Sequence, residues 1–226
     1  MARRTKEDAA ATRELLLDAA EREFCERGAS RTSLAEVASA AGVTRGAVYW
    51  HFRDKSDLFS AMCARAQLPL ETMLERAGST PQADPLDTLR TLMTAALIRL
   101  ATDRRSQAVF EVLFHKCELT AELAPIAQRR QAARSLCLAH VERLLQQAVD
   151  AGQLPRDTDT SLATHSLHAF MSGLMREWVL EKDAYDLAAV APALVDMTVT
   201  GLRNDPPRRP NRVRPRVRPR SCTAER

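Results

Sequence analysis

The chain has 226 residues, 45% of them hydrophobic and 27% charged, and its formal net charge at pH 7 is +4. This length and composition allow one large or two small domains with a hydrophobic core that needs no disulfide framework. No run of the chain approaches the roughly 18 apolar residues of a membrane span, and residues 1–13 contain no apolar stretch of a signal peptide. We therefore expect a cytoplasmic protein without a membrane partner.

The positive charge is concentrated at the C-terminus. Residues 204–226 carry eight arginines against two acidic residues, which leaves a net charge of −2 for the rest of the chain. Any affinity for a nucleic acid must therefore come from a few well-placed cations rather than from the overall charge. The five cysteines are scattered and form no CxxC pair, so we expect neither a zinc site nor a set of disulfide bonds.

The first predicted helix covers residues 7–27. Apolar residues recur along one side of it at helical spacing, and Gly28 ends it. Ahead of it, Arg3, Arg4 and Lys6 form a short basic arm. Two interpretations of this arm stay open: a frayed, solubilising terminus, or a contact with the backbone or minor groove of DNA.

Residues 33–52 are predicted to form two short helices joined by a tight turn. Ser33 and Glu36 have the spacing of a capping box at the start of the first helix. Gly42 stands where the chain leaves that helix, a position that often needs a positive φ. Thr44 can cap the second helix. This pattern is typical of a helix-turn-helix.

The second helix of the pair keeps Val48 for the small shared core and leaves donors, a cation and aromatic side chains exposed. Such a face suits a helix lying in the major groove of DNA. To these we add the residue that caps the first helix and the lysine that starts the next one, for which a solvated surface position is the alternative to a phosphate contact. The predicted DNA-binding residues are Ser33, Thr44, Arg45, Gly46, Tyr49, Trp50, His51 and Lys55.

The rest of the chain also shows helical patterns, and seven glycines with few β-branched runs favour an all-α fold of about nine helices. A fourth helix follows its predicted N-cap Asp54, and a loop precedes Pro85. Pro192 either kinks the last helix or marks its late start. The further helices are predicted over residues 85–102, 104–117, about 125–152, 158–181 and 186–202.

The tail that follows alternates arginine with proline. Its low content of apolar residues predicts disorder over residues 204–226. Solubility is one interpretation of its charge, and non-specific DNA affinity is the other.

Several of these segments resemble a known family. Residues 11–28 and 44–59 resemble the DNA-binding end of TetR-family repressors, and residues 1–13, 114–119 and 172–178 are similar to the AcrR-like branch, which controls multidrug efflux pumps. The resemblance implies a DNA-binding domain over residues 9–69, with the helix-turn-helix at 33–52. It also implies a ligand-binding and dimerisation domain over residues 70–203.

Polar residues interrupt the apolar patterns of the helices that line the ligand cavity in this family. Taken singly, each is more often a satisfied core residue. Together with neighbouring methionines and aromatic residues, they suggest an adaptable site for small hydrophobic effectors. The predicted effector-binding residues are Gln67, Phe110, Glu111, Phe114, His115, Gln131, His168, Met171 and Met175. A body that serves only for dimerisation is the alternative.

A homodimer is expected because one short recognition helix reads only a few base pairs. Residues 158–181 and 186–202 would pair with their copies as a four-helix bundle, and the small residues Ala169 and Gly173 allow close approach. The two recognition helices should stand about 34–36 Å apart on a pseudo-palindromic, double-stranded operator.

The sequence thus predicts a ligand-responsive repressor of a multidrug efflux operon that uses no cofactor. The same fold acting as an activator, or on another operon, is the alternative. An enzyme is more remote, because the sequence has no Gly-rich phosphate loop, no HExxH and no nucleophile elbow. We accordingly predict no catalytic and no metal-binding residues.

Overall fold

A computed structural model describes the backbone of residues 2–117 and 124–209, and the side chains within them except those of residues 2–5, 67–70, 125 and 129. These residues form helices and no β-strand apart from one isolated bridge, so the predicted all-α class is confirmed. None of the helices in the described ranges is long and apolar enough to cross a bilayer. The helices are α1 (Ala2–Arg27), α2 (Leu34–Ala40), α3 (Arg45–His51), α4 (Lys55–Ser79), α5 (Pro85–Thr102), α6 (Arg104–His115), α7 (Ala124–Asp150), α8 (Thr160–Leu180) and α9 (Leu187–Asn204).

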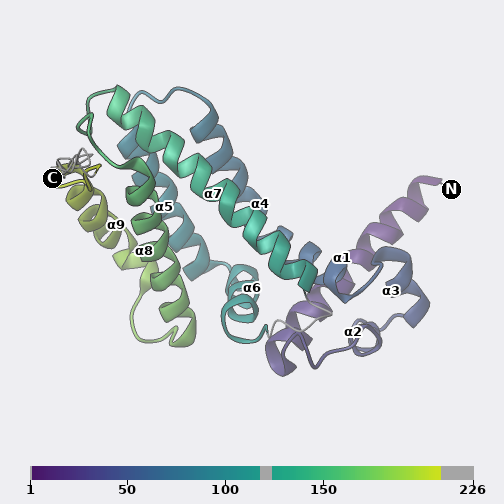
Figure 1. The fold of residues 1–226 in the computed structure, drawn as a ribbon. Helices are drawn as coiled ribbons and strands as arrows, with labels where there is room; N and C mark the ends of the chain where they lie inside the picture. Colours follow the sequence, from purple (N-terminus) through teal and green to yellow (C-terminus); the bar gives the residue numbers. More distant parts are fainter. Residues whose placement is uncertain (1, 118–123, 210–226) are drawn as a thin grey trace, which may run out of the picture.

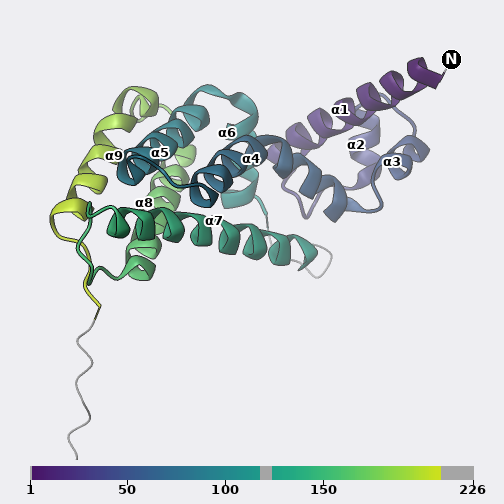
Figure 2. The same ribbon diagram turned by 90° about the horizontal axis from the view of Figure 1, so that it is seen from above.

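The molecule is elongated, with α1, α2 and α3 at one end and α5, α8 and α9 at the other (Figure 1). The two long helices α4 and α7 pack against each other and run along the molecule between these ends, as the view in Figure 2 also shows. The N-terminus lies beside the end that holds α3, and the described C-terminal residues lie at the opposite end.

The buried side chains form two clusters. The N-terminal core contains residues of the first four helices, among them Phe24, Val37, Val48 and Phe59, and it also includes residues of α6 and α7. The C-terminal core is built from α5, α7, α8, α9 and the end of α4. Because α4 is one continuous helix that reaches both cores, the expected domain boundary after residue 69 falls inside it.

Aspartate side chains start most of the later helices. The carboxylate of Asp54 accepts from the amide of Asp57 at the start of α4, and that of Asp84 accepts from the amide of Asp87 at the start of α5. Asp103, Asp159 and Asp186 do the same for α6, α8 and α9. Each such cap stabilises a helix by about 1 kcal/mol, which explains why the predicted starts near residues 55, 85 and 104 agree with the structure.

One expectation about helix ends is wrong, and one of the two alternatives for Pro192 is excluded. Residues 2–6 already belong to α1, so Arg3, Arg4 and Lys6 do not form an arm ahead of it. Helix α9 begins at Leu187 and continues through Pro192, so this proline does not mark a late start. Proline lacks a main-chain N–H, so α9 has one hydrogen-bond donor fewer at this position, but its packing is maintained by the buried residues Ala191, Val195 and Val199.

The predicted disordered tail also begins too early. Asn204 ends α9, and residues 205–209 fold back along the loop between α7 and α8. The Asp159 amide donates to Pro207 O over 2.7 Å, and the Arg209 amide donates to Asp157 O over 3.0 Å. An ion pair between Arg208 and Asp157 adds to this C-terminal strap, residues 205–209. Residues 210–226 lie outside the described residues.

Candidate functional site

The helix-turn-helix is held by local hydrogen bonds that the sequence predicts. The Glu36 amide donates to Ser33 Oγ over 3.2 Å, and the Ser33 amide donates to Glu36 Oε2 over 2.8 Å, which completes the capping box. The backbone and hydroxyl hydrogen bonds from Ser33 lower the pKa of Glu36. Gly42 makes the turn with a φ of +68°, and Thr44 Oγ1 accepts from the Ala47 amide over 3.3 Å.

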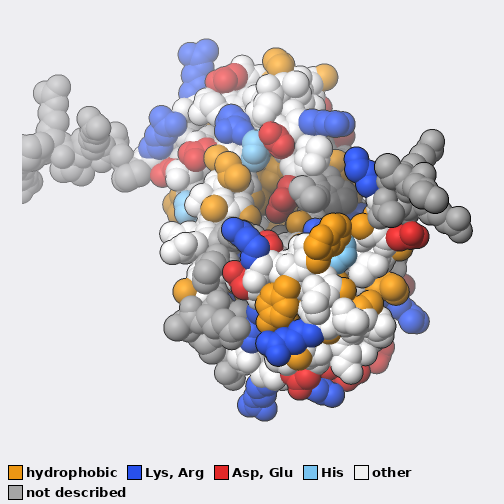
Figure 3. All heavy atoms as spheres, turned by 90° about the vertical axis from the view of Figure 1, so that its right-hand side faces the viewer, with side chains coloured by type: hydrophobic (Ala, Val, Ile, Leu, Met, Phe, Trp, Pro, Cys, Tyr) orange, Lys and Arg blue, Asp and Glu red, His pale blue; other side chains and the backbone are white. Residues whose placement is uncertain are grey.

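Neighbouring residues of α3 point to opposite sides. Val48 is fully buried in the N-terminal core, whereas 49% of Tyr49 and 73% of Trp50 are exposed. The Arg45 guanidinium lies 5.6 Å from the centroid of the Tyr49 ring and 3.5 Å from its hydroxyl oxygen. The exposed face of α3 therefore combines a cation with two large aromatic side chains. Figure 3 looks onto this end of the molecule, where hydrophobic and basic side chains lie side by side.

The remaining predicted residues of α3 are placed less uniformly. Thr44 and Gly46 are exposed beside Arg45. His51 is half-buried, with its ring 4.5 Å from that of Trp50 in an edge-to-face arrangement. Burial and the nearby Arg13 lower the pKa of His51, so it is a neutral donor or acceptor at pH 7.

Lys55 is not placed as predicted. Its Nζ donates to Ser30 O over 3.2 Å, and 6% of the residue is exposed. The structure therefore agrees neither with an extended phosphate contact nor with a solvated surface lysine. The side chain turns inward because a main-chain carbonyl of the α1–α2 connection lies within its reach. Ser33 is exposed, but its hydroxyl is engaged by Glu36 Oε2 at 2.8 Å.

Two arginines beside α3 were not in the predicted set. Arg31 and Arg53 are both exposed, and both line a hollow of about 400 Å³ between the α1–α2 connection and the α3–α4 turn, next to Tyr49. Arg53 Nε lies 3.7 Å from Asp57 Oδ2, and 79% of its side chain is exposed. Arg31 stands two residues before the Ser33 cap and Arg53 directly after Phe52, and these positions at the ends of the helix-turn-helix are the sequence signal that identifies them.

Seven of the predicted effector residues lie on two helices that pack against each other, α6 and α8. The rings of Phe110 and Phe114 are 5.5 Å apart, and His115 Nε2 lies 3.2 Å from Arg176 O in α8. Met171 and Met175 are half-buried against the C-terminal core. His168 is also half-buried, and burial followed by the charge of Arg134 lowers its pKa. These residues form an aromatic and methionine-rich region on α6 and α8.

The positions of the other predicted effector-binding residues give less support to the predicted site. Gln131 is exposed on α7, and the side chain of Gln67 lies outside the described residues. Glu111 accepts hydrogen bonds from Lys116 at 2.8 Å and Lys182 at 2.9 Å. Partial burial raises its pKa, but the two lysines outweigh this effect and leave the pKa lowered. Glu111 is thus a paired carboxylate and not an open ligand-binding group.

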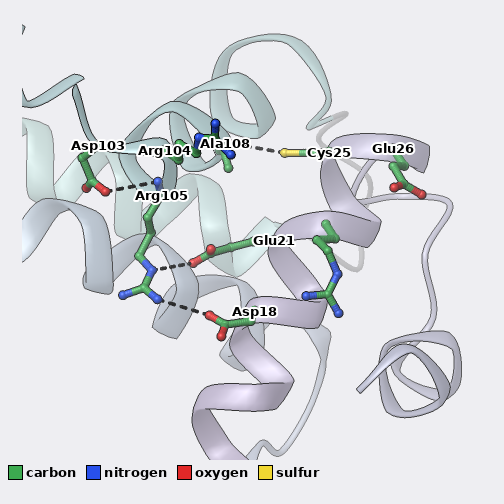
Figure 4. A pocket seen from close by; sticks show the side chains of 9 residues that line it. Asp18, Glu21, Cys25, Glu26, Asp103, Arg104, Arg105 and Ala108 are labelled. Atoms are coloured by element: carbon green, nitrogen blue, oxygen red, sulfur yellow. Dashed lines mark hydrogen bonds and ion pairs between the residues drawn. The ribbon is translucent and has the colours of Figure 1, made fainter. Parts of the chain in front are cut away.

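A second hollow, of about 620 Å³, lies between α1 and α6 (Figure 4). Charged side chains dominate its lining, including Asp18, Glu21, Asp103 and Arg105. This charged lining differs from the apolar chamber that the sequence predicts, and the hollow lies where α1 of the N-terminal core meets the start of α6.

Comparison with known proteins shows which protein family the chain resembles. The sequence model described as "Bacterial regulatory proteins, tetR family" matches residues 16–62, and that described as "MAATS-type transcriptional repressor, C-terminal region" matches residues 84–203. The transcriptional regulator AcrR of Shigella flexneri is 42% identical over 191 residues, which are 83% of this chain and 87% of that protein.

Solved structures agree. NalD, described as the secondary repressor of the MexAB-OprM multidrug efflux pump in Pseudomonas aeruginosa, is 35% identical with a TM-score of 0.78, covering 86% of this chain and 97% of that one. SmeT, the repressor of the Stenotrophomonas maltophilia multidrug efflux pump SmeDEF, is 36% identical in its triclosan complex. That structure has a TM-score of 0.76 and covers 84% of this chain and 91% of that one. The chain belongs to the TetR family of bacterial transcriptional regulators.

Proposed function

We propose that this protein represses a multidrug efflux operon, binds a pseudo-palindromic operator as a homodimer, and is released by small hydrophobic compounds. The observation that carries the proposal is the outer face of α3, where Arg45, Tyr49 and Trp50 stand exposed on a capped helix whose inner residue, Val48, is fully buried. We infer the efflux operon as the target because the similar proteins NalD and SmeT are described as repressors of multidrug efflux pumps.

In the proposed complex, α3 lies in the major groove. The Arg45 guanidinium offers two donors to a guanine edge, while Tyr49 and Trp50 offer apolar surface to thymine methyl groups and the sugar-phosphate wall. Arg31 and Arg53, on either side of the hollow beside Tyr49, are suited to phosphate contacts. Lys55 can contact the DNA backbone only if the hydrogen bond from its Nζ to Ser30 O breaks. Since the target is chromosomal DNA, the protein acts in the cytoplasm.

The proposed dimer uses α8 and α9. Exposed apolar or small residues recur along α8 at helical spacing, among them Leu162, Ala169, Gly173 and Leu180, and Met197 stands exposed on α9. Small residues let two helices approach closely, and a two-fold dimer presents two α3 helices to two half-sites.

The proposed effector site is the aromatic and methionine-rich region on α6 and α8. Methionine and phenylalanine side chains can repack around ligands of different shapes, and the complex of SmeT with triclosan shows that a relative binds a small aromatic compound. A ligand that binds a splayed dimer more tightly than the DNA-bound form lowers operator affinity by the difference between those two affinities, and no further.

The test is a footprint of the full-length protein on the DNA upstream of its own gene, with and without triclosan. We expect protection of one pseudo-palindromic site, which Tyr49→Ala abolishes while leaving a folded dimer. Protection that survives Tyr49→Ala unchanged would reject the role of α3. A transcript from the adjacent operon that falls when the gene is deleted would identify an activator instead.

A further inference from the structure

The last residues of the chain carry a dense positive charge that the proposed function does not use. Residues 210–226, here called the arginine tail, hold six arginines against one glutamate and contain no lysine. Five of these arginines occupy every second position from Arg212 to Arg220, and valine and proline alternate between them. The arginine tail lies outside the described residues, but its sequence gives it a formal side-chain charge of +5.

The part of the chain that carries the helix-turn-helix has almost no net charge. Residues 1–69 hold eleven basic and ten acidic side chains, and residues 70–203 hold fourteen basic and seventeen acidic ones. Some cations of the N-terminal end are also paired: Arg27 Nη1 lies 3.1 Å from Glu36 Oε1. A net charge near zero gives little long-range attraction for a polyanion, so the arginine tail is the segment that can supply it.

The structure fixes the point at which the arginine tail leaves the body. In the C-terminal strap, the Arg209 amide donates to Asp157 O over 3.0 Å, and the Arg208 guanidinium pairs with the carboxylate of the same aspartate. These contacts hold the strap against the loop between α7 and α8. The arginine tail therefore starts at the end of the molecule opposite α3 (Figure 1).

The arginine tail is short compared with the distance to α3. Helix α7 runs from that loop to the N-terminal core, which includes its residue Ile126, and a helix of 27 residues is about 40 Å long. A flexible chain as long as residues 210–226 has an average end-to-end distance of about 20–25 Å. DNA that meets the arginine tail is therefore not the stretch that lies under α3.

We propose that the arginine tail is a second, sequence-independent DNA-binding site, at the opposite end of the molecule from α3, through which the protein holds two duplex segments at once. Guanidinium groups form bidentate hydrogen bonds with phosphate oxygens, and each phosphate that is neutralised releases condensed counterions. Valine and proline side chains carry no donor or acceptor for base edges, so the contact is to the phosphate backbone. This site does not depend on the identity of the operator or of the operon.

The phosphates of an anionic membrane offer similar chemistry to a guanidinium group. Stable attachment to a bilayer usually takes an inserted apolar group in addition to basic residues. Residues 210–226 contain no aromatic residue, leucine, isoleucine or methionine that could be inserted. The composition of the arginine tail therefore favours DNA over a membrane.

Two variants of the full-length protein separate the charge of the arginine tail from its length. The neutral variant replaces the five alternating arginines by glutamine: Arg212→Gln, Arg214→Gln, Arg216→Gln, Arg218→Gln and Arg220→Gln. The lysine variant replaces the same five residues by lysine and is the matched control, because it keeps the charge. Both variants retain the C-terminal strap, so their melting temperatures should equal that of the wild type.

The first measurement is the salt dependence of binding to a duplex without an operator, followed by fluorescence anisotropy. Each neutralised phosphate adds about 0.9 to the slope of log affinity against log salt concentration, so the slope should be at least about 3 steeper in the wild type and the lysine variant than in the neutral variant. Equal slopes in all three proteins would overturn the proposal. Equal slopes together with sedimentation on phosphatidylglycerol vesicles that only the neutral variant loses would identify a membrane as the partner instead.

The second measurement tests whether two duplexes bind at once. The protein is bound to immobilised DNA from upstream of its own gene, and a labelled duplex without an operator is then added. The wild type and the lysine variant should retain at least about fivefold more labelled duplex than the neutral variant. A steeper salt slope without retained duplex would place the arginine tail on the same DNA as α3 and overturn the second site. A protein that does not stay on the immobilised DNA would count against the proposed operator, while the salt slopes still decide whether the arginine tail binds DNA.

Discussion

At the scale of single residues, the charge of Arg45 is placed where DNA would meet α3. Its guanidinium is exposed and stacked near the Tyr49 ring, with a hydrogen bond to the Tyr49 hydroxyl that raises the pKa of Arg45 further above neutrality. The arginine therefore stays charged under all physiological conditions. The Tyr49 contact also limits the rotamers that it samples before DNA arrives.

Arg45→Ala should lower operator affinity by at least about 30-fold, because a lost base contact costs about 1–3 kcal/mol in each of two half-sites. Arg156→Ala, which removes an exposed arginine at the opposite end of the molecule, is the charge-matched control and should change affinity by less than about twofold. Fluorescence anisotropy titrations with operator and scrambled DNA make the comparison. Equal losses in both variants would mean that the effect is one of overall charge.

Gly78 is needed for close packing of α4 on α7. A Cβ added there would stand 3.0 Å from His140 O and 3.2 Å from His140 Cα. Replacing a helical glycine by alanine usually stabilises by about 1 kcal/mol, but forcing two helix backbones apart costs about 1–3 kcal/mol. At this position the cost of the clash should exceed the gain in helix propensity, so alanine should destabilise the protein.

The net loss is up to about 2 kcal/mol, so Gly78→Ala is expected to lower the melting temperature by up to about 8 °C, at about 2–4 °C per kcal/mol for a chain of this size. Gly46→Ala is the control, because the Cβ would meet nothing closer than Thr44 Oγ1 at 3.9 Å. Differential scanning calorimetry on both variants decides. A melting temperature for Gly78→Ala at or above that of the wild type would show that α4 and α7 separate without cost.

At the scale of elements, prediction from sequence succeeds where the determinants are local. The Ser33 capping box, the Gly42 turn and the burial of Val48 depend on residues within 20 positions of one another, so their spacing reveals them. The same holds for the aspartate caps. The element type and start of most helices followed from these signals alone.

Contacts between segments far apart in the sequence could not be predicted from the sequence alone. Lys55 turns toward Ser30 O, 25 positions away, and Arg105 and Lys116 reach α1 across 87 and 91 positions. No periodicity or spacing encodes such pairs, because they depend on how the helices pack. Glu111 looked like a candidate ligand group partly for the same reason: of the two lysines that pair with it, Lys116 is five residues away, but Lys182 is 71 residues away and is brought in by packing.

The C-terminal strap is an element with a measurable role. A chain ending at Arg209 keeps the two main-chain hydrogen bonds and the Arg208–Asp157 pair, whereas a chain ending at Asn204 loses all three. Since each of the two main-chain bonds contributes about 0.5–1.5 kcal/mol, the shorter chain should melt about 2–12 °C lower. Circular dichroism melts of the two truncations test this. Indistinguishable melts would show that the strap adds no stability.

At the scale of the whole molecule, the proposed dimer can be tested by a substitution that disturbs the dimer interface but not the folded monomer. A Cβ at Gly173 of α8 meets nothing within 4 Å in the single chain, and the residue is exposed. A large side chain therefore fits the monomer, but it would separate two α8 helices that pack closely across a two-fold axis.

Gly173→Arg should accordingly shift the protein from dimer to monomer in sedimentation velocity and weaken operator binding, with the helical circular dichroism signal unchanged. Ala83→Arg, on the exposed α4–α5 connection, adds the same side chain away from α8 and should remain dimeric. A Gly173→Arg protein that sediments as a dimer would place the interface elsewhere.

The separation of the two chain ends has a practical consequence for anyone who labels this protein. The strap fixes the chain at Arg209 on the end farthest from α3, whereas α1 starts beside α3 (Figure 1). A fluorescent protein fused directly after Arg209 would be carried clear of a bound duplex. One fused ahead of Ala2 would compete with the nucleic acid for the same space.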